Sequence, residues 1–314
     1  WMIRNVVRFL ESIHPERDDV KFKVKRYLEQ MVYSNAFVAL AAALLTFAAQ
    51  ALKGHAFAAS YFLMAALYVF AMHTLNLYLD RDAIRLNDPG RAAFYQSCKG
   101  VFTSLSVAAV IVSLWIAAAT GSRTFVALAL LVVLGVLYAV PLFMPSSWQQ
   151  LNALKIKDIP ASKTLFVPVA WASVAVIIPG MEQFLQSFGK TCYAFWVIAL
   201  FVLIRTALLD LLAVQGDRLV GKETIVVLLG ESKTVHFVMA ALGLLAVSLV
   251  LGPVSGLSTS FAYVMLLGVA AYGWCLRMCF QKPLKEDPVF EAIIESVLLA
   301  IGASGLLWNL AAKF

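Results

Sequence analysis

Long runs of apolar residues alternate with short polar segments along almost the whole chain. Nine of these runs are long enough to cross a bilayer, which takes about 20 predominantly apolar residues in a helix. They are rich in Ala, Leu, Val and Phe and show no alternation of apolar and polar positions. The pattern therefore predicts helices and argues against the strands of a membrane barrel. The predicted spans are 33–53, 56–79, 100–120, 124–144, 163–181, 191–213, 233–252, 259–278 and 288–310.

Composition places the chain among integral membrane proteins. It has 314 residues, 62% of them hydrophobic, and a mean hydropathy of +0.85, whereas soluble globular proteins have roughly 45–50% apolar residues. We therefore predict an all-α, polytopic membrane protein with one nine-helix domain over residues 33–314. Residues 1–32 are too charged for a cleaved signal peptide, and we expect a cytoplasmic amphipathic helix there, lying on the membrane surface.

Basic residues are distributed unevenly between the two sides of this topology. The N-terminal segment and the loops after spans two, four, six and eight hold 20 of the 25 Lys and Arg residues. Because positively charged segments stay in the cytoplasm, we predict a cytoplasmic N-terminus and a C-terminus on the opposite side. The net charge of +7 follows from this topology and attracts anionic lipid, so it does not predict nucleic-acid binding.

Two acidic clusters lie at matching places, at the cytoplasmic ends of spans two and six. The first covers Asn76 to Asp82; the second starts at Asp210 and continues through Gly216-Asp217-Arg218 to Lys222. A carboxylate at such a depth is costly unless it binds something, so it marks a functional site by default. We therefore predict one shared site for a metal ion and a phosphate group at the cytoplasmic face.

The spacing within the clusters favours a magnesium–diphosphate site. Asn76 and Asp80 are four residues apart, and Asp210 and Asp217 are seven apart, so each pair shares a helix face. Oxygen ligands without His or Cys select Mg²⁺, which completes its shell with water and substrate phosphate. Gly216 would allow a ligand to approach the backbone. A membrane setting suggests a diphosphate that carries a lipid tail.

Several charged residues also have a structural interpretation. Asp82 and Asp88 fit ordinary loop charges, and Arg205 is close enough in sequence to be the partner of Asp210. Glu291 and Glu295 share one face at the start of span nine, where solvation or pairing with Lys282 or Lys285 is the simplest reading.

The two clusters resemble the motifs of the UbiA superfamily of intramembrane prenyltransferases. The family's first motif has the form NDxxDxxxD, which reads here Asn76, Leu77, Asp80 and Ile84. Its second has the form DxxDxxxD, often followed by RxxG, and reads here Asp210, Ala213, Asp217, then Arg218 and Gly221. The segment from Tyr138 to Pro141, with the lysines and Trp171 that follow, also resembles the family's region between helices four and five. Three motif positions that carry Asp in the family are apolar here.

The resemblance implies nine helices around a central cavity and Mg²⁺-dependent transfer of a prenyl group from a polyprenyl diphosphate. The acceptor would be an aromatic compound or a lipid. Metal ligands would be Asn76, Asp80, Asp210 and Asp217, the three aspartates being catalytic. Diphosphate-binding residues would be Asn76, Arg81, Lys155, Lys157, Lys163, Arg218 and Lys222. Aromatic residues of the cavity would be Tyr78 and Tyr138.

Two other functions remain open at this point. A phosphoribosyl-type donor with a polyprenyl phosphate acceptor would use the same motifs. A non-catalytic protein, serving as a lipid-binding or structural subunit, would explain the apolar residues at Leu77, Ile84 and Ala213. A transporter is less favoured, because transporters commonly place their polar groups near the midplane of the membrane.

Overall fold

A computed structural model describes residues 29–56, 58–139, 159, 161–219, 221, 224–281 and 288–311, except the side chains of 81–83, 183, 280 and 281. Within these residues, nine helical segments are long and apolar enough to cross a membrane, as predicted. The predicted surface helix over residues 1–32 falls almost entirely outside the described residues. The nine segments are α3 (Ala36–Lys53), α4 (Ala59–Leu79), α7 (Lys99–Thr120), α8 (Ser122–Ala139), a fifth segment beginning with α9 (Ser162–Ala172), α10 (Phe188–Leu219), α12 (Glu231–Val254), α13 (Phe261–Gln281) and α14 (Pro288–Ala311).

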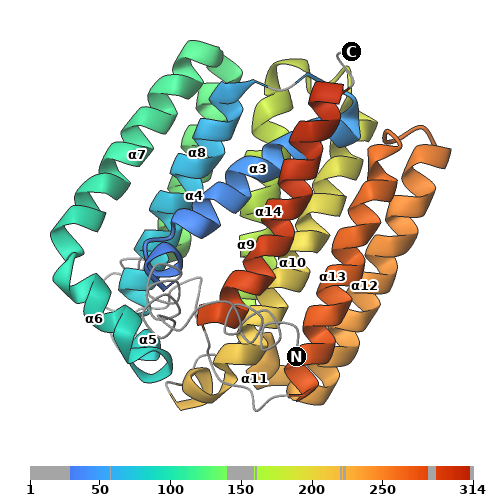
Figure 1. Ribbon diagram of the computed structural model, residues 1–314. Coiled ribbons are helices and arrows are strands. Elements are labelled where there is room, and N and C mark those ends of the chain that lie inside the picture. The colour runs from blue at the N-terminus through green and yellow to red at the C-terminus, as the bar shows by residue number, and fades with distance from the viewer. Residues whose placement is uncertain are drawn as a thin grey trace, which may run out of the picture.

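The helices form one bundle around α10 (Figure 1). Helices α4, α7 and α8 lie on one side, α12 and α13 on the other, and α3 and α14 cross in front of α9 and α10. α10 is the most enclosed of the nine spans. Its side chains Ile198, Phe201, Ile204 and Leu208 are fully buried. The outer helices α7 and α8 instead expose many apolar side chains, as a lipid-facing surface requires.

The fifth span is not a regular α-helix. After α9 the chain makes a π-helical turn, Ser173–Ile177, and then a 3₁₀ turn, Ile178–Gln183. π-Helical turns inside a helix leave carbonyl groups without their usual partners. Here the carbonyl of Val176 accepts a hydrogen bond of 3.3 Å from the buried Lys53 Nζ, at the end of α3.

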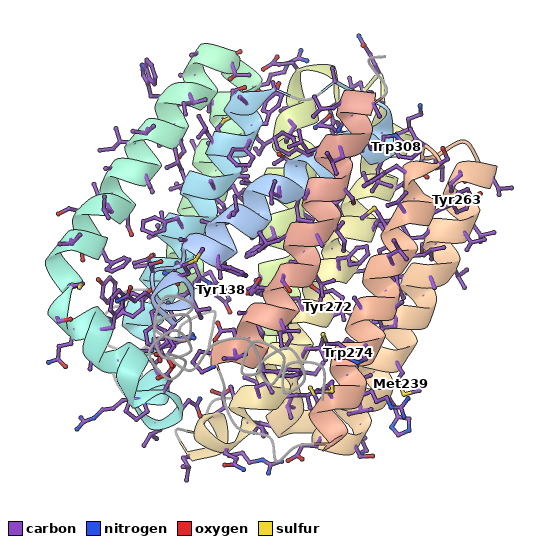
Figure 2. The ribbon with its side chains drawn as sticks, in the orientation of Figure 1. Tyr138, Met239, Tyr263, Tyr272, Trp274 and Trp308 are labelled. Carbon is purple, nitrogen blue, oxygen red and sulfur yellow. The ribbon has the colours of Figure 1, made fainter. Side chains whose placement is uncertain are left out.

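Three short helices gather at one end of the bundle: α5 (Arg81–Asn87), α6 (Pro89–Ser97) and α11 (Ile225–Leu229) (Figure 1). Asp88 separates the first two and caps α6, because its Oδ1 accepts a 3.0 Å hydrogen bond from the Arg91 amide. The same oxygen accepts a hydrogen bond from the Tyr33 hydroxyl at 3.0 Å. Asp88 therefore has a structural role. Toward the other end of the bundle lie Tyr263 and Trp308, which Figure 2 labels.

The closest helix contact is between α14 and α3. Gly302 and Gly305 of α14 face the backbone of Leu44 and Ala48 so closely that a Cβ atom at either glycine would overlap it. Small residues at such crossings let two membrane helices touch along their backbones, and the packing itself then holds them together. This contact fixes α14 against the first span, and α14 carries Glu291 and Glu295.

We predict that Gly302→Ala lowers the free energy of unfolding by about 1–3 kcal/mol, because the added methyl group overpacks the α14–α3 contact. Gly243→Ala on α12 is the matched control, since a Cβ there meets nothing within 4 Å and removal of a helical glycine stabilises by up to about 1 kcal/mol. Both are measured by unfolding of the purified protein in detergent. Equal effects of the two changes would contradict the packing argument.

Candidate active site

The second acidic cluster lies on a single continuous helix. The sequence predicted that span six ends at residue 213, but α10 continues to Leu219 and is 32 residues long. At 1.5 Å per residue the helix is about 48 Å long, longer than the roughly 30 Å of bilayer hydrocarbon. Asp210 and Asp217 are only 0% and 2% exposed. Both carboxylates therefore point into the protein rather than into a solvated loop.

Asp210 is held by two neighbouring residues at the start of α9. Its Oδ1 lies 2.7 Å from the Lys163 ammonium nitrogen, and its Oδ2 accepts a 3.1 Å hydrogen bond from the Thr164 hydroxyl. Hydrogen bonds of this length between charged groups are among the strong ones. The Lys163 side chain is 39% exposed, whereas the Asp210 carboxylate that it binds is completely buried. The structure thus brings Lys163, which is predicted to bind diphosphate, into contact with Asp210, which is predicted to bind the metal ion.

The first acidic cluster ends α4. The backbone amide of Asp80 donates to the carbonyl of Asn76 at 3.0 Å, so the two residues are one helical turn apart, as predicted. Both side chains are half-buried. Helix α5 then starts at Arg81 and packs against α10, where the Asn87 side chain lies against Gly216. The close approach expected at Gly216 is therefore made by Asn87 and not by a ligand.

The two clusters meet at Lys163. The charge of its ammonium interacts with Asp210 most strongly, and then with Asp217 and Asp80. Tyr138, at the end of α8, interacts with Lys163, Asp80 and Asp210, and Figure 2 shows it in the half of the bundle nearer to α5 and α6. Its hydroxyl is 3.5 Å from Ser162 Oγ. We call Lys163, Asp80, Asp210 and Asp217 the lysine–aspartate cluster.

Other predicted site residues lie elsewhere. The Tyr78 hydroxyl donates to the Lys99 carbonyl at 3.0 Å, and its ring packs edge-on against Tyr95, so Tyr78 belongs to the contact of α4 with α6 and α7. Arg218 forms an exposed ion pair of 3.3 Å with Glu231 of α12. Both residues are therefore outside the lysine–aspartate cluster. Of the predicted site residues, Lys155, Lys157, Lys222 and the side chain of Arg81 lie outside the part of the chain that the structure describes.

Comparisons with known proteins identify the family and the fold. A sequence model of the UbiA prenyltransferase family matches residues 35–297, which include both acidic clusters. The chain belongs to the UbiA prenyltransferase family. A comparison with curated proteins returned no match.

Solved structures of UbiA proteins share the fold. The UbiA homologue of Archaeoglobus fulgidus bound to GPP and Mg²⁺ is 17% identical with a TM-score of 0.61, covering 89% of this chain and 98% of that one. The apo homologue of Aeropyrum pernix K1 is 16% identical with a TM-score of 0.64, covering 87% and 98%. A structure of digeranylgeranylglyceryl phosphate synthase is 14% identical with a TM-score of 0.53, covering 92% and 98%.

The oxygen donors of this UbiA chain suit a magnesium ion whose coordination shell is completed by water and substrate phosphate. Within the described residues, no three His, Cys, Asp or Glu side chains form a group that could enclose a metal. Mg²⁺ does not need such a cage, since one or two carboxylates with water and substrate phosphate suffice. Asn76, Asp80, Asp210 and Asp217 supply oxygen donors of the right type, and the oxygens of Asp210 also contact Lys163 and Thr164.

A second buried charge pair was not identified from the sequence. Arg205 of α10 pairs with Glu295 of α14, both nearly inaccessible, and its Nε donates to Glu295 Oε1 at 2.8 Å. The guanidinium also lies over the Trp171 ring, 4.8 Å from its centroid. Asp210 is thus not the partner of Arg205. An arginine inside an apolar run signals a buried partner, but the sequence does not indicate on which helix it lies.

This pair belongs to a wider polar network between α10, α13 and α14. Tyr272, labelled in Figure 2, interacts electrostatically with Glu295 and Arg205. Nearer the end of the bundle, Glu291 pairs with Arg91, while the expected partners Lys282 and Lys285 lie outside the described residues. Burial, aided by the neighbouring Asp88 carboxylate, raises the pKa of the Tyr33 hydroxyl, so Tyr33 stays protonated and keeps donating to Asp88.

We predict that Arg205→Met destabilises the protein by about 3–5 kcal/mol, because it leaves the Glu295 carboxylate buried without its partner. The double variant Arg205→Met/Glu295→Leu should recover most of this loss, because neither charge remains. Unfolding in detergent of the two single variants and the double variant gives the coupling energy. Additive effects of the single changes would show that the pair is not coupled.

Proposed function

We propose that this protein is a Mg²⁺-dependent prenyltransferase that moves a prenyl group from a polyprenyl diphosphate to an aromatic or lipid acceptor. One observation carries the proposal: Lys163 forms an ion pair with the buried Asp210, and its charge also interacts with Asp217 and with Asp80 of the other motif. A cation beside carboxylates at the end of a membrane bundle suits a metal-bound diphosphate. The A. fulgidus homologues bound to GPP or DMAPP with Mg²⁺ support this reading.

Different residues of this chain would bind the diphosphate and the magnesium ion. Lys163 has N–H groups left for phosphate oxygens after its bond to Asp210. Asn76, Asp80 and Asp217 would hold Mg²⁺, with Asp210 as a further candidate ligand. When bound, the ion acts as a Lewis acid toward the diphosphate. The basic residues predicted to add to this site, though not described by the structure, are Arg81, Lys155, Lys157 and Lys222.

The reaction needs charge stabilisation at the leaving group. The allylic C–O bond breaks, and its electron pair leaves with the diphosphate, whose growing charge the Lys163 ammonium stabilises by hydrogen bonding. The acceptor then forms a bond to the allylic carbon and loses a proton. Tyr138 lies beside Lys163, and the face of its ring would favour the developing carbocation. We place this site at the cytoplasmic face, with the N-terminus on the same side, from the distribution of basic residues.

A non-catalytic role would use the same contacts differently. Both carboxylate oxygens of Asp210 already have protein partners, which is the arrangement expected if the ion pair only locks α9 to α10. The two readings differ in whether Asp80 and Asp217 are needed for turnover.

The test supplies nanodiscs containing the protein and membrane lipid extract with a labelled polyprenyl diphosphate and Mg²⁺. We expect label to enter a new lipid or aromatic product, and chelation to stop it. Asp80→Asn and Asp217→Asn should each reduce the rate about 100-fold or more, the usual scale for loss of one group that stabilises developing charge. Glu231→Gln, on the surface of α12, is the matched control and should keep full activity.

Other outcomes would replace the proposal. Product that forms only with a phosphoribosyl diphosphate and a polyprenyl phosphate would establish the phosphoribosyl-type reaction. If no product forms and no prenyl diphosphate binds in the presence of Mg²⁺, the result would support the non-catalytic role instead.

A further inference from the structure

His73 lies on the same face of α4 as the first acidic cluster. It precedes Asn76 by three residues and Asp80 by seven, which are helical spacings for one face. At 1.5 Å per residue, His73 is about 10 Å from Asp80 along α4, toward the middle of the bundle. Its ring interacts electrostatically with Arg205, Lys163 and Asp80. The imidazole therefore faces the interior and is near both buried ion pairs of α10.

The His73 ring is available to a ligand. Within the described residues it takes part in no hydrogen bond and no ion pair, and it is only half-buried. Its nitrogens are not enclosed by neighbouring atoms. A neutral imidazole, the main form of an unperturbed histidine at neutral pH, has one nitrogen that accepts a hydrogen bond. His73 thus offers a proton-accepting nitrogen to a molecule inside the bundle.

Two other polar groups of the interior lack partners but are closed off. Glu295 Oε2 and the Tyr272 hydroxyl have no hydrogen-bond partner among the described residues, and both atoms are enclosed. The other oxygen of Glu295 already holds Arg205. A substrate could reach these two groups only after the helices had moved apart. Of the three groups, His73 is the one with an accessible surface.

The described cations around His73 are each offset by a carboxylate. Three cationic side chains act on its ring, and the Asp80 carboxylate opposes them. The three cations form ion pairs, Arg205 with Glu295, Arg91 with Glu291 and Lys163 with Asp210. A proton that moves to His73 therefore does not meet an unpaired positive charge among these residues.

A bound prenyl diphosphate would present its reactive carbon on the side of His73. Its diphosphate would lie at the lysine–aspartate cluster, and its apolar tail favours the apolar interior. The allylic carbon joins the two parts, so it lies on the side of the diphosphate that faces the middle of the bundle. His73 is on that side, farther from the end of α4 than Asp80. An acceptor that attacks this carbon from there would bring its leaving proton close to the imidazole.

We propose that His73 is the base that takes the proton lost by the acceptor. The proposal rests on the proposed function, because it assumes that a prenyl diphosphate binds at the lysine–aspartate cluster. The allylic C–O bond breaks with its electron pair on the diphosphate, and an electron pair of the acceptor forms the new bond to the allylic carbon. The proton then moves from the acceptor to the free ring nitrogen of His73, and from there to water. Because an acceptor that has bonded to the carbocation is strongly acidic, an uncharged imidazole is basic enough to take its proton.

The alternative is that the departing diphosphate takes the proton itself and His73 only fills space in the bundle. The two possibilities differ in what the loss of the imidazole changes. A missing base slows transfer to the acceptor, while ionisation of the prenyl diphosphate continues. A missing packing residue affects both reactions alike.

The experiment follows labelled polyprenyl diphosphate with Mg²⁺ on the protein in nanodiscs. With membrane lipid extract as the source of acceptor, transfer should fall about 100-fold in His73→Gln, the scale of a lost general base. Without extract, release of the prenyl alcohol should stay close to the rate of the unaltered protein, because water captures the carbocation and passes its proton to other water. His236→Gln, which changes an exposed histidine of α12, is the matched control and should keep full transfer.

Binding is measured separately by calorimetry with Mn²⁺ and inorganic diphosphate, and His73→Gln should have the affinity of the unaltered protein. Unchanged transfer in His73→Gln would overturn the inference and leave the prenyltransferase intact. Equal losses of transfer and of alcohol release would overturn it as well, because they indicate a packing role. His73→Asn repeats the comparison if His73→Gln does not fold. If the unaltered protein forms no transfer product, the proposed function fails and the inference falls with it.

Discussion

A charged side chain inside a membrane bundle needs an opposite charge on another helix, and α10 carries such side chains at its centre. Arg205 pairs with Glu295 of α14, and Asp210 pairs with Lys163 of α9. Each pair ties α10 to a different neighbour at a definite height along its axis. Apolar packing alone would leave these heights poorly defined, because Leu, Val and Phe offer many equivalent contacts in lipid. The ion pairs therefore determine which residues of α9 and α14 face α10, and with that the position of the site.

The two pairs have different surroundings, and this separates their roles. Arg205 and Glu295 are both enclosed, and the Arg205 guanidinium lies over the Trp171 ring, so the contact of the two charges is a structural one. Lys163 is half-exposed and interacts with carboxylates from two helices. The Arg205–Glu295 pair holds α10 and α14 together, and the Lys163–Asp210 pair holds α9 against α10. The same principle of charge neutralisation thus gives both a structural and a binding contact on one helix.

The spans were predictable because bilayer thickness sets their length and lipid sets their composition. The approach of Lys163 to Asp210 was not predictable, but the carboxylates at Asp80 and Asp210 could be singled out as a candidate site because they follow long apolar runs, where an unpaired charge is costly. The end of α10 was not predictable, because Gln215 and Gly216 resemble the start of a loop in the sequence. In the structure Gly216 stays helical, and the space it leaves is filled by Asn87, which lies far away in sequence. The partners of Arg205 and Glu291 were missed for the same reason: pairing across helices depends on packing that no local pattern contains.

The contact of Asn87 with Gly216 has a consequence for how the site can change shape. Helix α5 is seven residues long, begins directly after Asp80, and ends against α10 one residue from Asp217. Helix α5 thus connects the end of α4, which carries Asp80, to α10, which carries Asp210 and Asp217. The spacing between α4 and α10 at this end of the bundle is therefore set by the contact of α5 with α10. Lys163 lies at the start of a less regular span, because after α9 the chain continues as a π-helical turn and a 3₁₀ turn.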